Sequence, residues 1–162
     1  MSKQAGFTLI ETMVAISIIV IGLMSSLALI TNSLSVFSNI QDRLIAANLA
    51  AEGIEVAHNI RDNNWLQSPG DTSKWKLGLD NGDYSVVYNS LSLGLSSDVL
   101  LKLDSSSGIY SYASGGNPTV FKRKISITNL SAYEMKIASI VTWQRKCGSY
   151  IISAEDHLFN WK

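Results

Sequence analysis

The hydrophobic pattern divides the chain into a helical first part and a strand-rich second part. From Phe7 to Ile30 nearly every residue is apolar, and Glu11 carries the only charge. A helix that is apolar all round suits lipid better than a half-exposed surface. These residues would rise about 36 Å as a helix, enough to cross a hydrocarbon core of about 30 Å. The pattern therefore predicts a transmembrane helix over residues 7–30.

Residues 31–64 keep a helical pattern but mix apolar and polar positions. Apolar residues recur at spacings of three and four, and no proline occurs before Pro69. We expect this amphipathic half to continue the membrane helix as one rod and to lie against a small sheet. The apolar positions that define the stripe are Leu34, Phe37, Ile40, Leu44, Ala47, Ala51, Ile54 and Ala57.

Residues 65–162 read as a β-rich globular domain. Clusters of Gly, Ser, Asn and Asp mark turns, and the segments between them alternate with period two. Expected strands are 84–89, 121–128, 135–143 and one beginning at Tyr150, with a further pair at 99–103 and 109–112. The turn at 145–148 is expected to join two of them as a hairpin. The predicted fold class is α+β, with a long N-terminal α-helix packed on an antiparallel β-sheet of four or more strands.

Composition narrows the range of functions. The 162 residues allow one ordinary domain plus a long helix. Lys+Arg and Asp+Glu are equal at 13 each, so net charge gives no support for nucleic acid or an acidic membrane surface as the main partner. Cys147 is the only cysteine, which excludes an intramolecular disulfide and a cysteine-based zinc site.

Three kinds of N-terminal segment fit a basic residue followed by an apolar run. Lys3 and the amino terminus orient the start toward the cytoplasm and the remainder outward. A secretory signal peptide could be cut near Ser26 and Ala28, although its apolar region would usually be shorter and uncharged. An uncleaved signal anchor leaves Glu11 unexplained, because an acidic side chain in a lipid-embedded helix costs about 2.5–3.5 kcal/mol. The third kind rests on a resemblance.

The stretch Gly6-Phe7-Thr8-Leu9-Ile10-Glu11, ahead of a long apolar run, closely resembles the class III signal of type IV prepilins and pseudopilins. The resemblance implies that residues 1–6 are a leader, which a prepilin peptidase/methyltransferase removes after Gly6 before methylating the new N-terminal Phe7. It also implies a role for Glu11, whose carboxylate would neutralise the Phe7 amine of a neighbouring subunit. Such a pair offsets part of the cost of burying either charge.

The resemblance further implies pilin architecture and a non-enzymatic structural subunit without a cofactor. Its partners would be the peptidase, other pilin subunits in a homo- or hetero-polymer, and the inner-membrane assembly platform. The chain would wait in the bacterial inner membrane with its C-terminal domain outside the cytoplasm, then enter an extracellular or periplasmic filament.

Three features favour a minor pilin within this family. The chain lacks the cysteine pair of many major pilins and the helix-bending proline of many members, and residues 50–65 are similar to minor-pilin sequences. A type II secretion pseudopilin is the nearest alternative. A non-polymerising, membrane-anchored extracytoplasmic binding module is the alternative of a different class.

Two other segments could be read as binding sites, but ordinary structural features explain them. Asp80-Asn81-Gly82-Asp83 lacks the spaced acidic ligands of an EF-hand, so turn chemistry accounts for it. Lys122 and Lys124 share one strand face and Arg123 points to the other, which favours a solvated surface over a phosphate site.

No catalytic constellation or metal site is predicted. His58 and His157 are too few and too scattered, and no catalytic triad or phosphate-binding glycine loop occurs. Cys147 is expected to lie in a turn without a role. The tail aromatics Phe159 and Trp161 are expected to pack against the domain.

Overall fold

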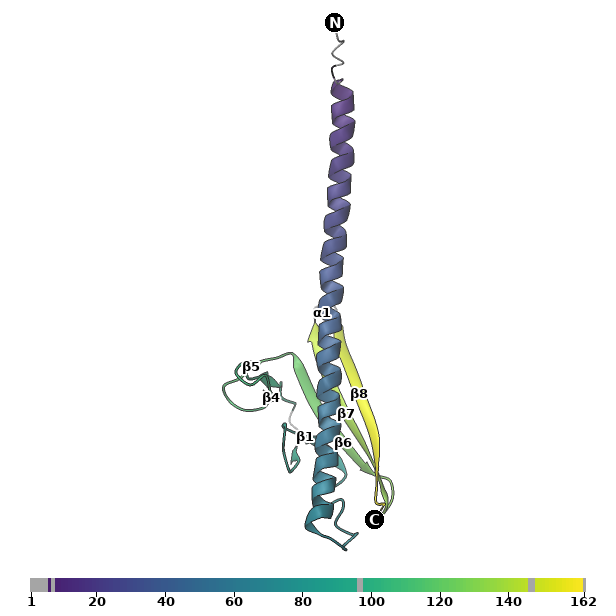
Figure 1. Cartoon of the computed structure of the whole chain (residues 1–162), viewed down its shortest axis with the longest axis vertical. Coiled ribbons are helices and arrows are strands. Elements are labelled where there is room, and N and C mark those ends of the chain that lie inside the picture. The colour runs from purple at the N-terminus through teal and green to yellow at the C-terminus, as the bar shows by residue number, and fades with distance from the viewer. Residues whose placement is uncertain (1–5, 7, 96–97, 146–147, 162) are drawn as a thin grey trace. The chain divides into compact units, whose positions relative to one another are not determined.

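The computed structural model describes residues 6, 8–95, 98–145 and 148–161. It contains two compact units, residues 1–42 and residues 43–162, each of which is described by itself. One helix, α1 (Leu9–Gln67), begins in the first unit and ends in the second. The strands all belong to the second unit (Figure 1).

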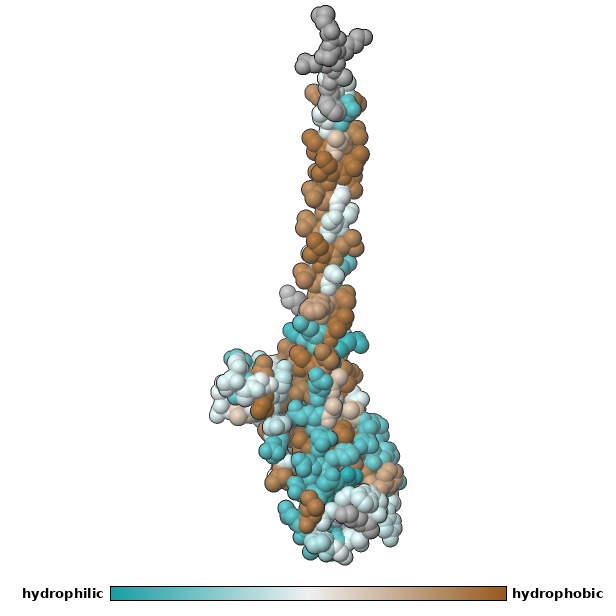
Figure 2. All heavy atoms as spheres, in the orientation of Figure 1, coloured by the Kyte–Doolittle hydropathy of each residue, from teal (hydrophilic) through white to brown (hydrophobic). Residues whose placement is uncertain are grey.

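Helix α1 is a single element of 59 residues, so the predicted continuation of the apolar helix into the amphipathic half is confirmed. It stops shortly before Pro69, which has no backbone N–H to continue the helix, and Gly70 follows with a φ of 90°. Among the described residues it is the helix long and apolar enough to cross a membrane, with a mean hydropathy of 2.6 over an 18-residue window. Figure 2 shows apolar side chains along this first stretch of α1.

The main sheet is antiparallel and has the order β2-β1-β6-β7-β8. Its strands are β1 (Gly82–Ser85), β2 (Gly94–Leu95), β6 (Phe121–Asn129), β7 (Glu134–Arg145) and β8 (Gly148–Phe159). The predicted α+β fold with four or more strands is confirmed. β7 pairs with β8 from Glu134↔Phe159 to Arg145↔Gly148, so the predicted hairpin is present. Residues 146 and 147 of its turn lie outside the described residues.

A second, smaller sheet has the order β4-β3-β5. Its strands are β3 (Lys102–Leu103), β4 (Tyr110–Ser111) and β5 (Asn117–Pro118). The pairing expected between 99–103 and 109–112 is confirmed, although each strand is only two residues long.

The expected strand at 84–89 is wrong in extent, because β1 ends at Ser85. The Val86 carbonyl accepts a hydrogen bond from Arg123 Nη2 at 2.8 Å, so it bonds to a side chain rather than to a neighbouring strand. Asn89 then takes a φ of 58°, a left-handed conformation that ends extended structure.

The core of the second unit consists of two apolar clusters between α1 and the sheet. One contains Ala46, Leu49, Ala50, Leu101, Phe121, Val141 and Trp143. The other contains Val56, Ala57, Ile60, Trp65, Trp75, Leu79, Val86, Ile125, Ile127, Met135, Ile137 and Leu158. Both combine residues of α1, β6 and β7, so the end of the helix is fixed to the sheet along its length.

The predicted helical stripe has the right period, and its last two positions face the core, with Ala57 buried and Ile54 packed against the apolar cluster, but its earlier positions have the wrong phase. Leu44, Ala47 and Ala51 are exposed, while Ala46, Leu49 and Ala50 are buried. Both sets recur at helical spacing, and the side of α1 that meets the sheet holds the residues that both clusters take from the helix: Ala46, Leu49, Ala50, Val56, Ala57, Ile60 and Trp65. The exposed set leaves apolar surface on the outer side of the helix.

Candidate functional site

The N-terminal start of α1 is fixed by Thr8. Its carbonyl accepts hydrogen bonds from the N–H groups of Glu11 at 3.1 Å and Thr12 at 3.3 Å. Its side-chain Oγ1 also accepts from the Glu11 N–H at 3.4 Å. Thr8 is therefore the N-cap residue and Glu11 the third residue of the helix, the spacing of a capping box.

Glu11 lies in the first turn of α1 and is exposed. An anionic side chain there interacts favourably with the partial positive charge of a helix N-terminus. Residues 12–41 carry no charged side chain, so the next charge along the helix is Asp42. Glu11 thus places a carboxylate at the head of a long uncharged segment of the helix.

The hydroxyl side chains within the apolar segment bond to their own helix. Ser17 Oγ donates to the Met13 carbonyl and Ser25 Oγ to the Ile21 carbonyl, each at 2.8 Å. Ser26 Oγ donates to the Gly22 carbonyl at 3.0 Å. Because these groups are satisfied within the helix, they remove a large part of the cost of placing hydroxyls in lipid.

The N-terminal segment has the features of a known class of signal. These features are a glycine, a capped helix start, a carboxylate and a long apolar run. Residues 1–27 match the family model of the prokaryotic N-terminal methylation motif. The chain carries a type IV prepilin class III signal. No curated protein and no solved structure matches the chain. The match ends at residue 27, so it says nothing of the second unit.

The methylation motif supports a type IV pilin or pseudopilin-like subunit, and it points to a structural role rather than to catalysis. It implies processing by prepilin peptidase and assembly with other pilins. The motif and the apolar start of α1 fit a membrane-anchored chain. Of the predicted site residues, Gly6 is exposed and precedes α1, Glu11 lies in its first turn, and Phe7 lies outside the described residues.

Arg123 links α1 to the sheet through buried hydrogen bonds, a role that the sequence did not predict. Its side chain is fully buried, and Nη1 donates to Glu52 Oε1 at 2.9 Å and to the Leu49 carbonyl at 3.1 Å. Nη2 donates to the Val86 carbonyl. One signal could have revealed it, because a single charge in phase with Phe121 and Ile125 on the inner strand face must be buried and paired.

Lys122 and Lys124 point away from Arg123, as predicted from strand alternation. Each pairs with a carboxylate, Lys122 with Asp98 at 2.7 Å and Lys124 with Asp83 at 2.9 Å. The hydrogen bond from Lys124 lowers the pKa of Asp83, the last residue of the segment Asp80-Asn81-Gly82-Asp83. Each lysine is thus paired with a carboxylate on the solvated face of β6.

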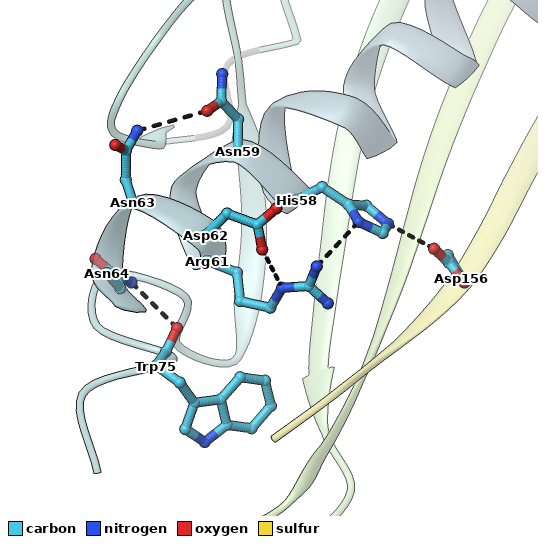
Figure 3. Close-up of polar contacts among 8 residues, drawn as sticks. All are labelled: His58, Asn59, Arg61, Asp62, Asn63, Asn64, Trp75 and Asp156. Carbon is cyan, nitrogen blue, oxygen red and sulfur yellow. Dashed lines mark hydrogen bonds and ion pairs between the residues drawn. The ribbon is translucent and has the colours of Figure 1, made fainter. Parts of the chain in front are cut away.

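The two histidines lie beside different carboxylates. His58 Nε2 lies 2.6 Å from Asp156 Oδ2, and Arg61 Nη2 lies 3.4 Å from His58 Nδ1 (Figure 3). His157 Nδ1 pairs with Glu134 at 2.7 Å. Among the described residues no group of three His, Cys, Asp or Glu could hold a metal.

The tail aromatics pack less fully than expected. Trp161 contacts Trp65 edge to face, with ring centroids 4.9 Å apart, yet its residue surface is 69% exposed. Phe159 stacks on His157 and is 49% exposed. Both rings therefore pack against the domain as expected, but each leaves much of its surface in solvent. Cys147 lies outside the described residues.

Proposed function

We propose that the chain is a structural subunit of a type IV pilus-like filament, processed by prepilin peptidase after Gly6 and assembled through its N-terminal helix as a minor pilin. The methylation motif at the head of α1 is the observation that carries the proposal. Cleavage after Gly6 would place the amine of Phe7 one residue before the Thr8 cap and four before Glu11.

The apolar start of α1 supports assembly through this helix. Large apolar side chains from Leu9 to Leu44 are exposed. In the membrane those up to Ile30 would contact lipid, and in a filament the whole apolar surface would contact neighbouring helices. Pairing of Glu11 with the Phe7 amine of a neighbour would neutralise both charges in a low-dielectric environment and fix the axial register of the two helices.

The minor-pilin assignment depends on features of the whole chain. One cysteine excludes an internal disulfide staple, and no proline interrupts α1. A pseudopilin would share the N-terminal features but remain in the periplasm. Immunoblotting of sheared surface filaments distinguishes the two, since a minor pilin is recovered in the sheared fraction and a pseudopilin is not.

The assembly role is tested by Glu11→Gln in the native host, with Glu55→Gln, an exposed glutamate of the same helix, as the matched control. We expect the first variant to be cleaved and membrane-inserted but incorporated into filaments about tenfold less or worse, because each 1.4 kcal/mol of lost pairing is a factor of ten. The control should assemble normally. Equal incorporation of both variants would show that Glu11 does not drive assembly, and absence of the parent chain itself from filaments would support a non-polymerising anchor.

A further inference from the structure

The end of α1 and the end of the chain together form an aromatic surface in the second unit. Trp65 and Trp161 meet edge to face with an interplanar angle of 75°. The guanidinium of Arg61 lies over the Trp65 ring, 4.8 Å from its centroid. Leu66, beside them on the helix, is largely exposed. We call this group the tryptophan surface: Arg61, Asp62, Trp65, Leu66 and Trp161.

The exposed indole of Trp161 is held by its neighbour in the chain. The backbone N–H of Asn160 donates to the Tyr133 carbonyl at 2.8 Å. The Asn160 side chain donates to the Thr72 carbonyl at 3.0 Å. Since Asn160 is bonded on both sides and Trp65 contacts the ring, Trp161 is presented to solvent in a defined place. Leu66, which lines the same hollow and is 75% exposed, extends the ring into a contiguous exposed apolar patch, and such patches mark binding surfaces.

Two adjoining hollows lie at this surface. One of about 250 Å³ is lined by the five residues of the tryptophan surface. Another of about 380 Å³ is lined by Trp65, Leu66, Ser68, Pro69, Gly70, Asp71 and Thr72. Aromatic walls with a few polar groups are characteristic of small-molecule sites. Because Trp65 and Leu66 line both hollows, a ligand of two or more linked units could occupy them together.

The charges of the first hollow define the ligand. Arg61 Nε donates to Asp62 Oδ1 at 2.8 Å, so the guanidinium and the carboxylate neutralise each other. A charged ligand would have to break this pair, and an apolar protein anchor would bury it at a cost. The hollow therefore fits a neutral ligand with one flat apolar face for an indole and with both donors and acceptors for Asp62 and Arg61.

Hexopyranoses combine these properties, since their axial C–H groups form an apolar face and their hydroxyls both donate and accept. We propose that the tryptophan surface binds a neutral hexopyranose unit of an oligosaccharide, with Trp161 as its stacking platform. This proposal does not depend on filament assembly, so its failure would leave the proposed function untouched.

The full chain, reconstituted in lipid nanodiscs rather than in a sugar-based detergent, is titrated separately with cellotetraose, maltotetraose and N-acetylchitotetraose. Tryptophan fluorescence and saturation-transfer NMR follow binding. We expect saturable binding of at least one sugar, with saturation transfer strongest to its ring C–H protons. Trp161→Ala should weaken that binding about tenfold or more, and Trp161→Phe less.

Tyr88→Ala, which removes an exposed aromatic far along the chain from this surface, is the matched control and should bind as the parent does. The proposal is overturned if none of the three sugars binds saturably. It is also overturned if Trp161→Ala binds as tightly as the parent, or if Tyr88→Ala and Trp161→Ala lose binding equally.

Discussion

Gly53 of α1 packs so closely on Ser139 of β7 that a Cβ at position 53 would overlap Ser139 Oγ, and it would lie 2.5 Å from Ile125 Cδ1. Gly53 and Glu52 on the helix, with Arg123 on β6 and Ser139 on β7, form a layer between the two apolar clusters. This buried layer allows only one alignment of α1 with the sheet, because a shift of the helix along the sheet would leave Arg123 unpaired.

Gly53→Ala should destabilise the second unit by about 1–3 kcal/mol, the usual cost of overpacking. Gly22→Ala provides a matched control in the same helix, since a Cβ there meets nothing within 4 Å. Helix propensity alone favours alanine over glycine by about 1 kcal/mol. Thermal unfolding followed by near-UV circular dichroism should therefore show a lower melting temperature for Gly53→Ala only. Stabilisation by both changes would contradict the close packing.

Arg123→Met should cost about 3 kcal/mol, near the low end for breaking a buried pair, because Glu52 keeps some contact with water. A double-mutant cycle with Glu52→Gln measures their coupling, expected at about 1 kcal/mol or more. Lys122→Met, the adjacent residue with a solvent-exposed partner, should change stability by less than about 0.5 kcal/mol. Additive effects of the Arg123 and Glu52 changes would show that the pair does not hold the helix.

The lowered pKa of Asp156 predicts that the stability of the second unit depends on pH. Burial alone would raise the pKa of this carboxyl, but hydrogen bonds from His58 and from the His157 N–H lower it below its ordinary value. A lowered folded-state pKa gives stability that is present above the unfolded-state value, about 3.9, and is lost as the pH falls through the folded-state pKa. The melting-temperature difference between the parent and Asp156→Asn should therefore shrink as the pH is lowered from 6 to about 2.5. A constant difference would contradict this assignment.

Local sequence was sufficient for the long helix and the three long strands. An uninterrupted apolar run cannot fold as a half-buried strand, and the alternation from Phe121 to Thr128 has no helical counterpart. The start of α1 could also be predicted from the sequence, since Thr8 and Glu11 have capping-box spacing. The same residues belong to the processing signal.

The sequence alone does not show which face of α1 meets the sheet. Leu44, Ala47 and Ala51 and the buried Ala46, Leu49 and Ala50 share one helical period, so periodicity does not choose between them. The choice depends on contacts with β6 and β7, above all the fit of Gly53 to Ser139 and the reach of Arg123 to Glu52. Such long-range pairing has no local signal. The tryptophan surface was missed for the same reason, because Trp65 and Trp161 meet only in the folded chain.

Intact-mass and N-terminal analysis of the chain from its native membrane or from sheared filaments tests prepilin processing most directly. We expect a mature chain that begins at an N-methylated Phe7, without residues 1–6. A chain that still begins at Met1 or Ser2 in cells with active prepilin peptidase would contradict it and indicate a plain anchor. A start near residue 29 would identify a secretory signal peptide instead.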